Sequence, residues 1–385
     1  MTEHTIPILQ ENAELQYLGE GAANIVYRIC PPQPGTPPPS ELEEYGEGTP
    51  PPSEIELFNK GDGDWGLFEN KLLRVRKDLP TTLPCAEAQA SWESLIAPLF
   101  TLSHLVTQSL VSLRPASVKT TYNHIHALNT SLKTWENDSS PAISTPTNSQ
   151  DAGSRPPKRR GVYLADDEYG LLVTDMSGPD VLQFKPKWLA QSPSAPEGAR
   201  RCRQCALVAR KAAVARSRGA KGEGRDGQGG EGGGFCPLDL LSENGDDVKR
   251  VADAILGPSA SSEIVSRFAR WISETDLLRR LRDVQVRMDR RGVLTAKADD
   301  EDDNRDLRVA MTVRDCSVFV RLPGSGLGGG GDVEGEVEAR IGDLDVKSPD
   351  KLAYWQEIEQ ALVEEGWYAG TEEARGENTC SLGRA

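Results

Sequence analysis

The sequence predicts a two-lobed α+β protein whose packed segments are separated by disordered insertions. Segments with strand periodicity come early in the 385-residue chain, helical segments fill the middle, and a β-hairpin pattern lies near the end. Strands and helices that segregate along the chain are typical of α+β folds. We expect a first lobe at 1–180 and a second lobe at 181–385.

The insertions are low-complexity tracts rich in Pro, Gly, Ser or acidic residues. Such compositions bury too little apolar surface to offset the entropy of ordering the backbone. We place them at 31–60 and 137–159 in the first lobe, and at 216–235, 297–306 and 324–334 in the second.

The chain is acidic. Its 44 Lys and Arg against 59 Asp and Glu give a net charge of −15, which argues against general binding to nucleic acids or anionic membranes. The seven cysteines are odd in number, and no apolar run approaches the ~20 residues of a membrane span. We expect a soluble monomer from a reducing compartment. The stretch RPPKRR at 155–160 is either a nuclear import signal or a basic loop, so the expected location is nucleus, cytoplasm or both.

A glycine-rich turn joins the first two predicted strands. The stretch LQYLGEGAANIVYRI at 15–29 indicates a strand, a turn of small residues over 19–24, and a second strand. Free backbone N–H groups in such a turn can bind phosphate. The turn lacks the terminal Gly-Lys-Ser or Gly-Lys-Thr of a P-loop and does not begin a helix, so a P-loop or Rossmann site is excluded. The remaining interpretation is a hairpin lid over a nucleotide. In the next strand, at 71–79, Arg74 is either an exposed edge cation or a charge beneath that lid.

The remaining segments follow in order. We expect a helix over 92–135, two strands around a turn in 161–177, an extended segment at 181–189, helices at 200–218 and 262–291, hairpin strands at 309–322 and 335–347, and a helix at 348–366.

The second hairpin strand carries Asp343, Asp345 and Lys347 on the face that begins with apolar residues. Ser348 and Pro349 then start a helix, with Lys351 in its first turn. Cations at a positive helix end suggest bound phosphate, and carboxylates beside phosphate suggest Mg²⁺. The alternative is a solvated turn that neutralises its own charges.

Three more polar residues stand in apolar or extended segments. Asp315 lies between apolar neighbours of the first hairpin strand, so it is either partnered or poised as a base. Lys185 and Lys187 flank Pro186 and point the same way from an extended backbone, which suits an anionic ligand or a surface strand.

The CxxC of Cys202 and Cys205 suggests zinc, which needs four ligands. No further Cys or His follows closely, and the four His lie at 4, 104, 124 and 126. A structural zinc is therefore doubtful.

Five motifs in this order resemble the inositol-pentakisphosphate 2-kinase family, particularly its fungal members. They are GEGAANIVY at 19–27, LLRVRK at 72–77, FKPKW at 184–188, CPLDL at 236–240 with VRDCSVFV at 313–320, and GDLDVKSPDK at 342–351.

The resemblance implies a two-lobed inositol phosphate kinase fold, distantly similar to protein kinases, that uses ATP and magnesium. It implies transfer of phosphate to the axial 2-hydroxyl of inositol 1,3,4,5,6-pentakisphosphate, giving inositol hexakisphosphate. By motif, the lid is formed by Gly21, Ala22, Ala23 and Asn24, with Arg74 reaching the ATP phosphates and the hinge at Val173 to Asp175 facing adenine.

The resemblance also implies roles in the second lobe. Lys185 looks like the cation between nucleotide and substrate, and Asp315 like the acid that activates the 2-hydroxyl. The implied substrate contacts are Lys187, Lys211, Lys347 and Lys351. Asp343 matches the magnesium ligand, and Asp345 is either a second metal ligand or a partner of Lys347.

Two other functions stay open. A non-catalytic inositol-phosphate binding protein would keep the lysines but not need the acids. A protein kinase relative is disfavoured because the chain has no HRD or DFG tripeptide.

Overall fold

The structure is a computed structural model that describes residues 5–31, 65–114, 123–137, 155–217, 234–324, 335–370 and 380–384. Most of four predicted insertions, at 31–60, 137–159, 216–235 and 324–334, lies outside these ranges. The second was predicted to extend too far, because residues 155–159 are described and Arg155 is buried. The chain forms two compact units, the first from 1–89 with 107–175 and the second from 90–106 with 176–385. The sequence led us to expect lobes of 1–180 and 181–385.

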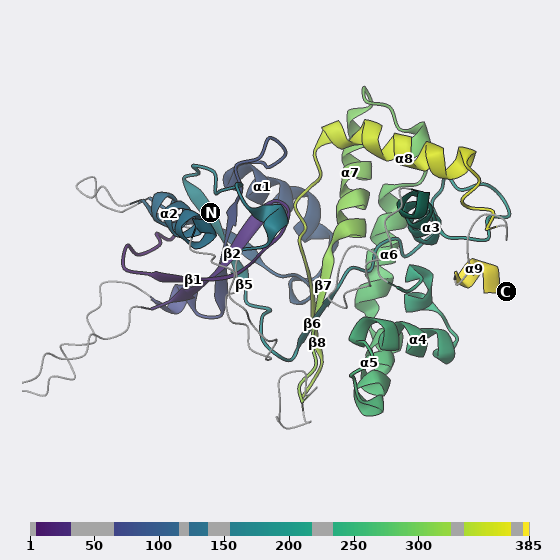
Figure 1. Ribbon diagram of the computed structural model, residues 1–385, viewed down its shortest axis with the longest axis horizontal. Coiled ribbons are helices and arrows are strands. Elements are labelled where there is room, and N and C mark those ends of the chain that lie inside the picture. Colours follow the sequence, from purple (N-terminus) through teal and green to yellow (C-terminus); the bar gives the residue numbers. More distant parts are fainter. Residues whose placement is uncertain are drawn as a thin grey trace, which may run out of the picture. The chain divides into compact units, whose positions relative to one another are not determined.

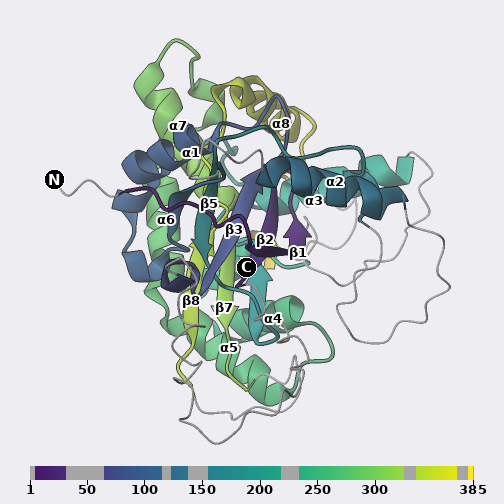
Figure 2. The ribbon, with the colours of Figure 1, turned by 90° about the vertical axis from the view of Figure 1, so that its left-hand side faces the viewer.

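The first unit is built on a five-stranded antiparallel sheet (Figure 2). In spatial order its strands are β1 (Glu14–Glu20), β2 (Asn24–Cys30), β3 (Lys71–Arg76), β5 (Tyr169–Thr174) and β4 (Gln108–Ser112). The predicted strand, turn and strand of 15–29 are therefore confirmed. The unit also holds most of α1 (Cys85–Ser91) and all of α2 (His124–Asn137), and α2 buries Ile125, Leu128 and Leu132 against the sheet core.

The second unit combines a three-stranded antiparallel sheet with helices (Figure 1). Its strands are β6 (Val181–Phe184), β7 (Ser317–Arg321) and β8 (Glu338–Gly342), with β7 in the middle. Its helices are α3 (Arg203–Ser217), α4 (Gly245–Leu256), α5 (Ser262–Glu274), α6 (Asp276–Met288), α7 (Glu301–Asp315), α8 (Leu352–Glu364) and α9 (Ser381–Arg384). None of the helices among the described residues is long and apolar enough to cross a membrane.

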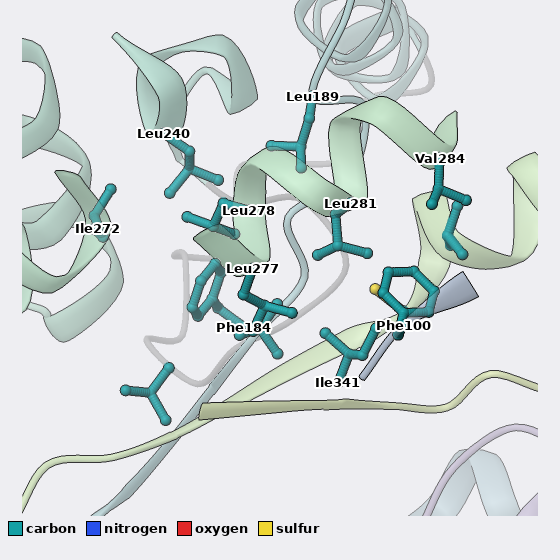
Figure 3. Close-up of a cluster of buried hydrophobic side chains, with 14 of the residues drawn as sticks. Phe100, Phe184, Leu189, Leu240, Ile272, Leu277, Leu278, Leu281, Val284 and Ile341 are labelled. Carbon is teal, nitrogen blue, oxygen red and sulfur yellow. The ribbon is translucent and has the colours of Figure 1, made fainter. Parts of the chain in front are cut away.

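The core of the second unit surrounds α6 (Figure 3). Leu277, Leu281 and Val284 of this helix are fully buried. They share one apolar cluster with Phe184 of β6 and Ile341 of β8. This packing joins the hairpin to the helices and thereby fixes where the ends of β6, β7 and β8 lie.

The segment 92–135 is not the single helix that we predicted. A π-helical turn at Trp92–Ile96 is followed by a short 3₁₀ turn with Pro98 near its start, and the chain then enters β4. The helix is interrupted because proline lacks a backbone N–H donor. The strand was missed because its sequence, QSLVS, is too short to show clear alternation. Only α2 is helical as expected.

Two further predictions were too coarse. Residues 262–291 form two helices because Thr275 ends α5 and its hydroxyl accepts the N–H of Leu277 at the start of α6. Of the two strands predicted in 161–177, only β5 forms, while Leu164 makes a single bridge to Lys77.

Residues 301–315 are α7, which corrects two predictions. The acidic run 297–306 is not an insertion, because Asp300 caps α7 and the acids of the first turn suit the positive end of the helix dipole. The predicted strand at 309–322 begins only at Ser317. All residues from 309 to 314 are buried, so this helix end lacks the one-sided periodicity of a surface helix.

Candidate active site

Three lysines surround the carboxylate of Asp315, the last residue of α7. Lys347 Nζ lies 2.7 Å from Oδ2, and Lys187 Nζ lies 3.0 Å from Oδ1. Lys185 Nζ lies 3.4 Å from Oδ1 and donates to the backbone carbonyl of Asp315 at 2.9 Å. These four residues, called the lysine cluster below, carry three positive charges and one negative charge, so they leave an excess of two positive charges in an acidic protein.

The lysines keep Asp315 ionised. Burial by itself raises the pKa of this carboxyl, but the attraction and hydrogen bond of Lys347, helped by Lys187 and Lys185, outweigh burial and hold the pKa well below its usual range. The side chain of Asp315 is 39% exposed and that of Lys347 is 33% exposed, so both remain accessible to a ligand. The cluster therefore offers an accessible anionic acceptor among cations that can also bind phosphate.

Helix α7 places Lys347 as well as Asp315. The backbone N–H of Lys347 donates to Thr312 Oγ1 at 3.1 Å, and its carbonyl accepts from Arg308 Nε at 2.5 Å. Thr312 is completely buried. Because these contacts lie one helical turn apart on α7, the helix holds the backbone of Lys347 beside its own C-terminal acid.

A second anchor holds Lys187, whose φ of 57° lies in the left-handed region. Its carbonyl accepts from Gln285 Nε2 at 2.9 Å, and Gln285 Oε1 accepts from the N–H of Leu189 at 2.9 Å. The next side chain, Trp188, is buried beneath the guanidinium of Arg314, which lies 3.5 Å from its ring centroid. The segment after β6 is thus fixed by α6 and α7.

Asp343 lies at the end of β8 and is held by the neighbouring strand. Its Oδ2 accepts from Ser317 Oγ at 2.5 Å, and Ser317 Oγ in turn accepts from Gln183 Nε2 at 3.0 Å. Its other carboxylate oxygen accepts no hydrogen bond from the described residues. One oxygen is therefore fixed while the other remains available.

The predicted face of the second hairpin strand is wrong beyond residue 342. Asp343 has a φ of 56°, which ends β8 and reverses which side chains turn inward. Ile341 is buried before this point, and Leu344 and Val346 are buried after it. Asp343, Asp345 and Lys347 consequently point away from the apolar core, while Ser348 caps the next helix as predicted.

In the first unit, the glycine-rich turn is held from beneath by a buried ion-pair network. Lys77 Nζ donates to the carbonyl of Gly21 at 2.8 Å and pairs with Glu20 at 2.5 Å. Arg155 binds both carboxylate oxygens of Glu20, at 2.7 and 2.9 Å, and also pairs with Glu136. Buried pairs of this kind fix geometry when each charge is hydrogen-bonded.

The exposed side of this turn keeps backbone donors available. Gly21 N–H donates to Asn24 within the turn, and Ala23 accepts from the N–H of Lys77. Within the described part of the chain, the N–H groups of Ala22 and Ala23 have no acceptor. Unpaired N–H groups in a tight turn are suited to an anion.

Arg74 is not an exposed edge cation, and its contact with the ATP phosphates stays a prediction. Its side chain is buried and donates to Gln108 Oε1 at 3.2 Å across the sheet. Lys77 is a cation whose Nζ directly contacts the turn, at the carbonyl of Gly21. Sequence alternation near β3 indicates only which face a side chain takes, so it did not single out Lys77, which follows this strand.

The other predicted residues lie in four places. Val173 is buried in β5, and the Asp175 N–H donates to Asn70 where the first unit ends. Lys351 lies 5.9 Å from the ring centroid of Tyr354, and Lys211 lies on an exposed part of α3. Their assigned roles, like that of Asp345, stay predictions.

Sequence reasoning missed several residues that position these side chains. They are Glu20, Lys77 and Arg155 under the turn, and Gln285, Arg308, Thr312, Arg314 and Ser317 around the lysine cluster. Arg155 is the first residue of RPPKRR, and its burial is unusual for an arginine in a basic run. These residues can be identified only from contacts between residues that are far apart in the chain.

Comparison with known proteins agrees with the resemblance in the motifs. A family model described as inositol-pentakisphosphate 2-kinase matches residues 17–361. A curated relative, "Inositol-pentakisphosphate 2-kinase" of Yarrowia lipolytica (strain CLIB 122 / E 150), is 30% identical over 189 residues. That match covers 49% of this chain and 53% of the relative, so the chain spans about half the length of the curated relative it matches.

Proposed function

The chain belongs to the inositol-pentakisphosphate 2-kinase family, and on this premise we propose that it transfers a phosphoryl group from ATP to the 2-hydroxyl of inositol 1,3,4,5,6-pentakisphosphate. The product is inositol hexakisphosphate. The observation that carries the proposal is the lysine cluster, in which an ionised acid lies among three cations that can exchange partners.

The charge of the substrate explains the cluster. Inositol pentakisphosphate carries on the order of eight to ten negative charges. A protein with a net charge of −15 repels such a ligand unless cations are concentrated locally. Substrate phosphates compete with Asp315 for Lys185, Lys187 and Lys347, and charge-assisted hydrogen bonds to phosphate are strong.

Asp315 orients the attacking hydroxyl. An acid whose pKa is held low is a weak proton acceptor before reaction, yet it is fully ionised and accepts a hydrogen bond from the substrate hydroxyl. Phosphoryl transfer depends mainly on positioning and charge neutralisation. Asp315 supplies the positioning, and the lysines neutralise charge on the phosphates.

Magnesium fits the acids that follow β8. Mg²⁺ takes one or two carboxylates together with phosphate oxygens, and Asp343 has one oxygen fixed by Ser317 while the other is available. We assign Asp343, with Asp345 as the second ligand, to hold the ion. When bound, Mg²⁺ neutralises charge on the transferred phosphoryl group.

The glycine-rich turn is the proposed ATP lid. The N–H groups of Ala22 and Ala23 have no acceptor among the described residues and can bind phosphate oxygens, while Lys77 and Glu20 hold the turn in place. Lys77 is committed to Gly21 and Glu20, so its role is to position the turn.

The test is incubation of the purified chain with ATP, Mg²⁺ and a panel of inositol phosphates, followed by chromatography of the products. Conversion of pentakisphosphate to hexakisphosphate supports the proposal. Binding of pentakisphosphate without any product would favour the non-catalytic binding protein, and phosphorylation of peptides alone would favour a protein kinase relative. Asp253→Asn, an exposed acid on α4, serves as the control for variants of Asp315 and Asp343.

A further inference from the structure

Four cysteines that are far apart in the chain meet in the second unit. Cys202 and Cys205 lie at the start of α3, Cys236 precedes the 3₁₀ helix Pro237–Leu241, and Cys380 precedes α9. Their four sulfur atoms all lie within 4.8 Å of one another. Cys202, Cys236 and Cys380 are buried and Cys205 is partly buried.

The spacing of the sulfur atoms is that of ligands around one ion. Cys202 Sγ lies 3.8 Å from Cys236 Sγ, which lies 3.7 Å from Cys380 Sγ. Four sulfurs at about 2.3 Å from a tetrahedral zinc ion are separated from one another by about 3.8 Å. Bonded sulfurs of a disulfide are about 2.05 Å apart, so these cysteines are not joined in pairs.

Backbone donors support negative charge on the sulfurs. The N–H of Cys202 donates to Cys380 Sγ at 3.1 Å, and the N–H of Cys205 donates to Cys202 Sγ at 3.5 Å. Hydrogen bonds of this kind orient metal ligands and stabilise thiolates. Four buried thiolates this close repel one another strongly unless a cation lies between them.

We propose that Cys202, Cys205, Cys236 and Cys380 form a closed tetrathiolate zinc site with a structural role. Zinc, unlike magnesium, prefers sulfur ligands, and four protein ligands leave no open position for catalysis. The fourth ligand, Cys380, lies outside the residues 17–361 that match the family. The site is therefore completed by a residue that follows the matched region.

The ion would join three segments of the second unit that are far apart in the sequence. It ties the start of α9 to the start of α3, and Arg384 of α9 adds a further link by pairing with Asp239 of the 3₁₀ helix Pro237–Leu241. Arg203, between the two cysteines of α3, pairs with buried Glu359 and lies 4.8 Å from the ring centroid of Trp188. Zinc at this site therefore also supports the segment that carries Lys187.

The test is metal analysis of the full-length chain, purified without a metal-affinity tag. We expect about one zinc per chain by mass spectrometry of the element. Cys380→Ser and Cys236→Ser should each reduce bound zinc at least about tenfold after dialysis. Cys85→Ser, which removes a buried thiol of the first unit outside the cluster, should leave the zinc content unchanged.

A second measurement covers variants that fold poorly. Wild-type protein loaded with Co²⁺ in place of zinc should show the absorption bands of tetrahedral thiolate coordination, and chelation should lower its melting temperature. Less than about 0.1 metal per chain, iron in place of zinc, or full zinc retention by a folded Cys380→Ser variant would each overturn the proposal. None of these readouts depends on kinase activity.

Discussion

Lys347 Nζ lies 2.7 Å from Asp315 Oδ2, so the cation that follows β8 is paired with the acid that ends α7. This pair shows that the acid proposed to orient the hydroxyl and a cation proposed to bind phosphate share one location. Removing the acid should therefore separate binding from reaction.

Asp315→Asn should lower kcat about 10²- to 10⁴-fold, because the amide cannot supply the anionic acceptor for the attacking hydroxyl. Binding of pentakisphosphate should stay equal or become tighter, since the three lysines lose their competing partner. Steady-state kinetics and calorimetric binding measure the two effects. If kcat is unchanged, or if binding falls together with kcat, the assigned role is wrong.

Asp315 should also make stability depend on pH. Its pKa is lower in the folded than in the unfolded protein, so its contribution is complete above the unfolded value of about 3.9 and is lost as pH falls toward the folded pKa. The side chain is 39% exposed, so the contribution is at most about 1 kcal/mol. Urea unfolding of wild type and Asp315→Asn from pH 7 to 3 should show a difference that shrinks below about pH 4. A difference that grows with acid would contradict the pairing.

Thr312→Val should raise KM for the inositol phosphate several-fold without changing KM for ATP. Valine keeps the shape of threonine but leaves the N–H of Lys347 without its acceptor, at a cost of about 1 to 3 kcal/mol. Thr130→Val on α2 removes a hydroxyl that bonds only within its own helix and should leave both constants unchanged. Equal changes in both KM values would point to general destabilisation.

Gly21→Ala tests the proposed lid. A Cβ at this position meets no atom within 4 Å, and φ is not positive, so we expect folding to be unaffected. The added methyl group reduces the approach of phosphate to the turn and should raise KM for ATP. Gly170→Ala is the structural counterpart, because its Cβ would lie 2.8 Å from Leu73 Cδ1 and should lower the free energy of unfolding. An unchanged KM for ATP in Gly21→Ala would remove the turn from the nucleotide site.

Glu20→Ala should destabilise the first unit by about 3 to 5 kcal/mol, because it leaves buried Lys77 and Arg155 without a shared carboxylate. Glu14→Ala on the exposed side of β1 should change stability by less than about 0.5 kcal/mol. Denaturant unfolding followed by tryptophan fluorescence gives both values. A small effect at Glu20 would mean that the network does not hold the turn.

Features that depend on neighbouring residues could be predicted from the amino-acid sequence. Alternation and small residues predicted β1, the glycine-rich turn, β2 and the hairpin of β7 and β8, and Ser348 with Pro349 predicted the helix start. These signals are local because strand periodicity and caps involve residues only a few positions apart. The ordered motifs likewise indicated the family.

How these segments pack against one another became clear from the three-dimensional structure alone. Residues 309–314 at the end of α7 are all buried, so their sequence lacks helical periodicity and resembled a strand. The left-handed backbone of Asp343 reversed which side chains after β8 point toward the core. The partners of Asp315 and the meeting of Cys202 with Cys380 depend on contacts between residues far apart in the chain. Such contacts arise when segments pack around the core. The periodicity of one segment does not predict them.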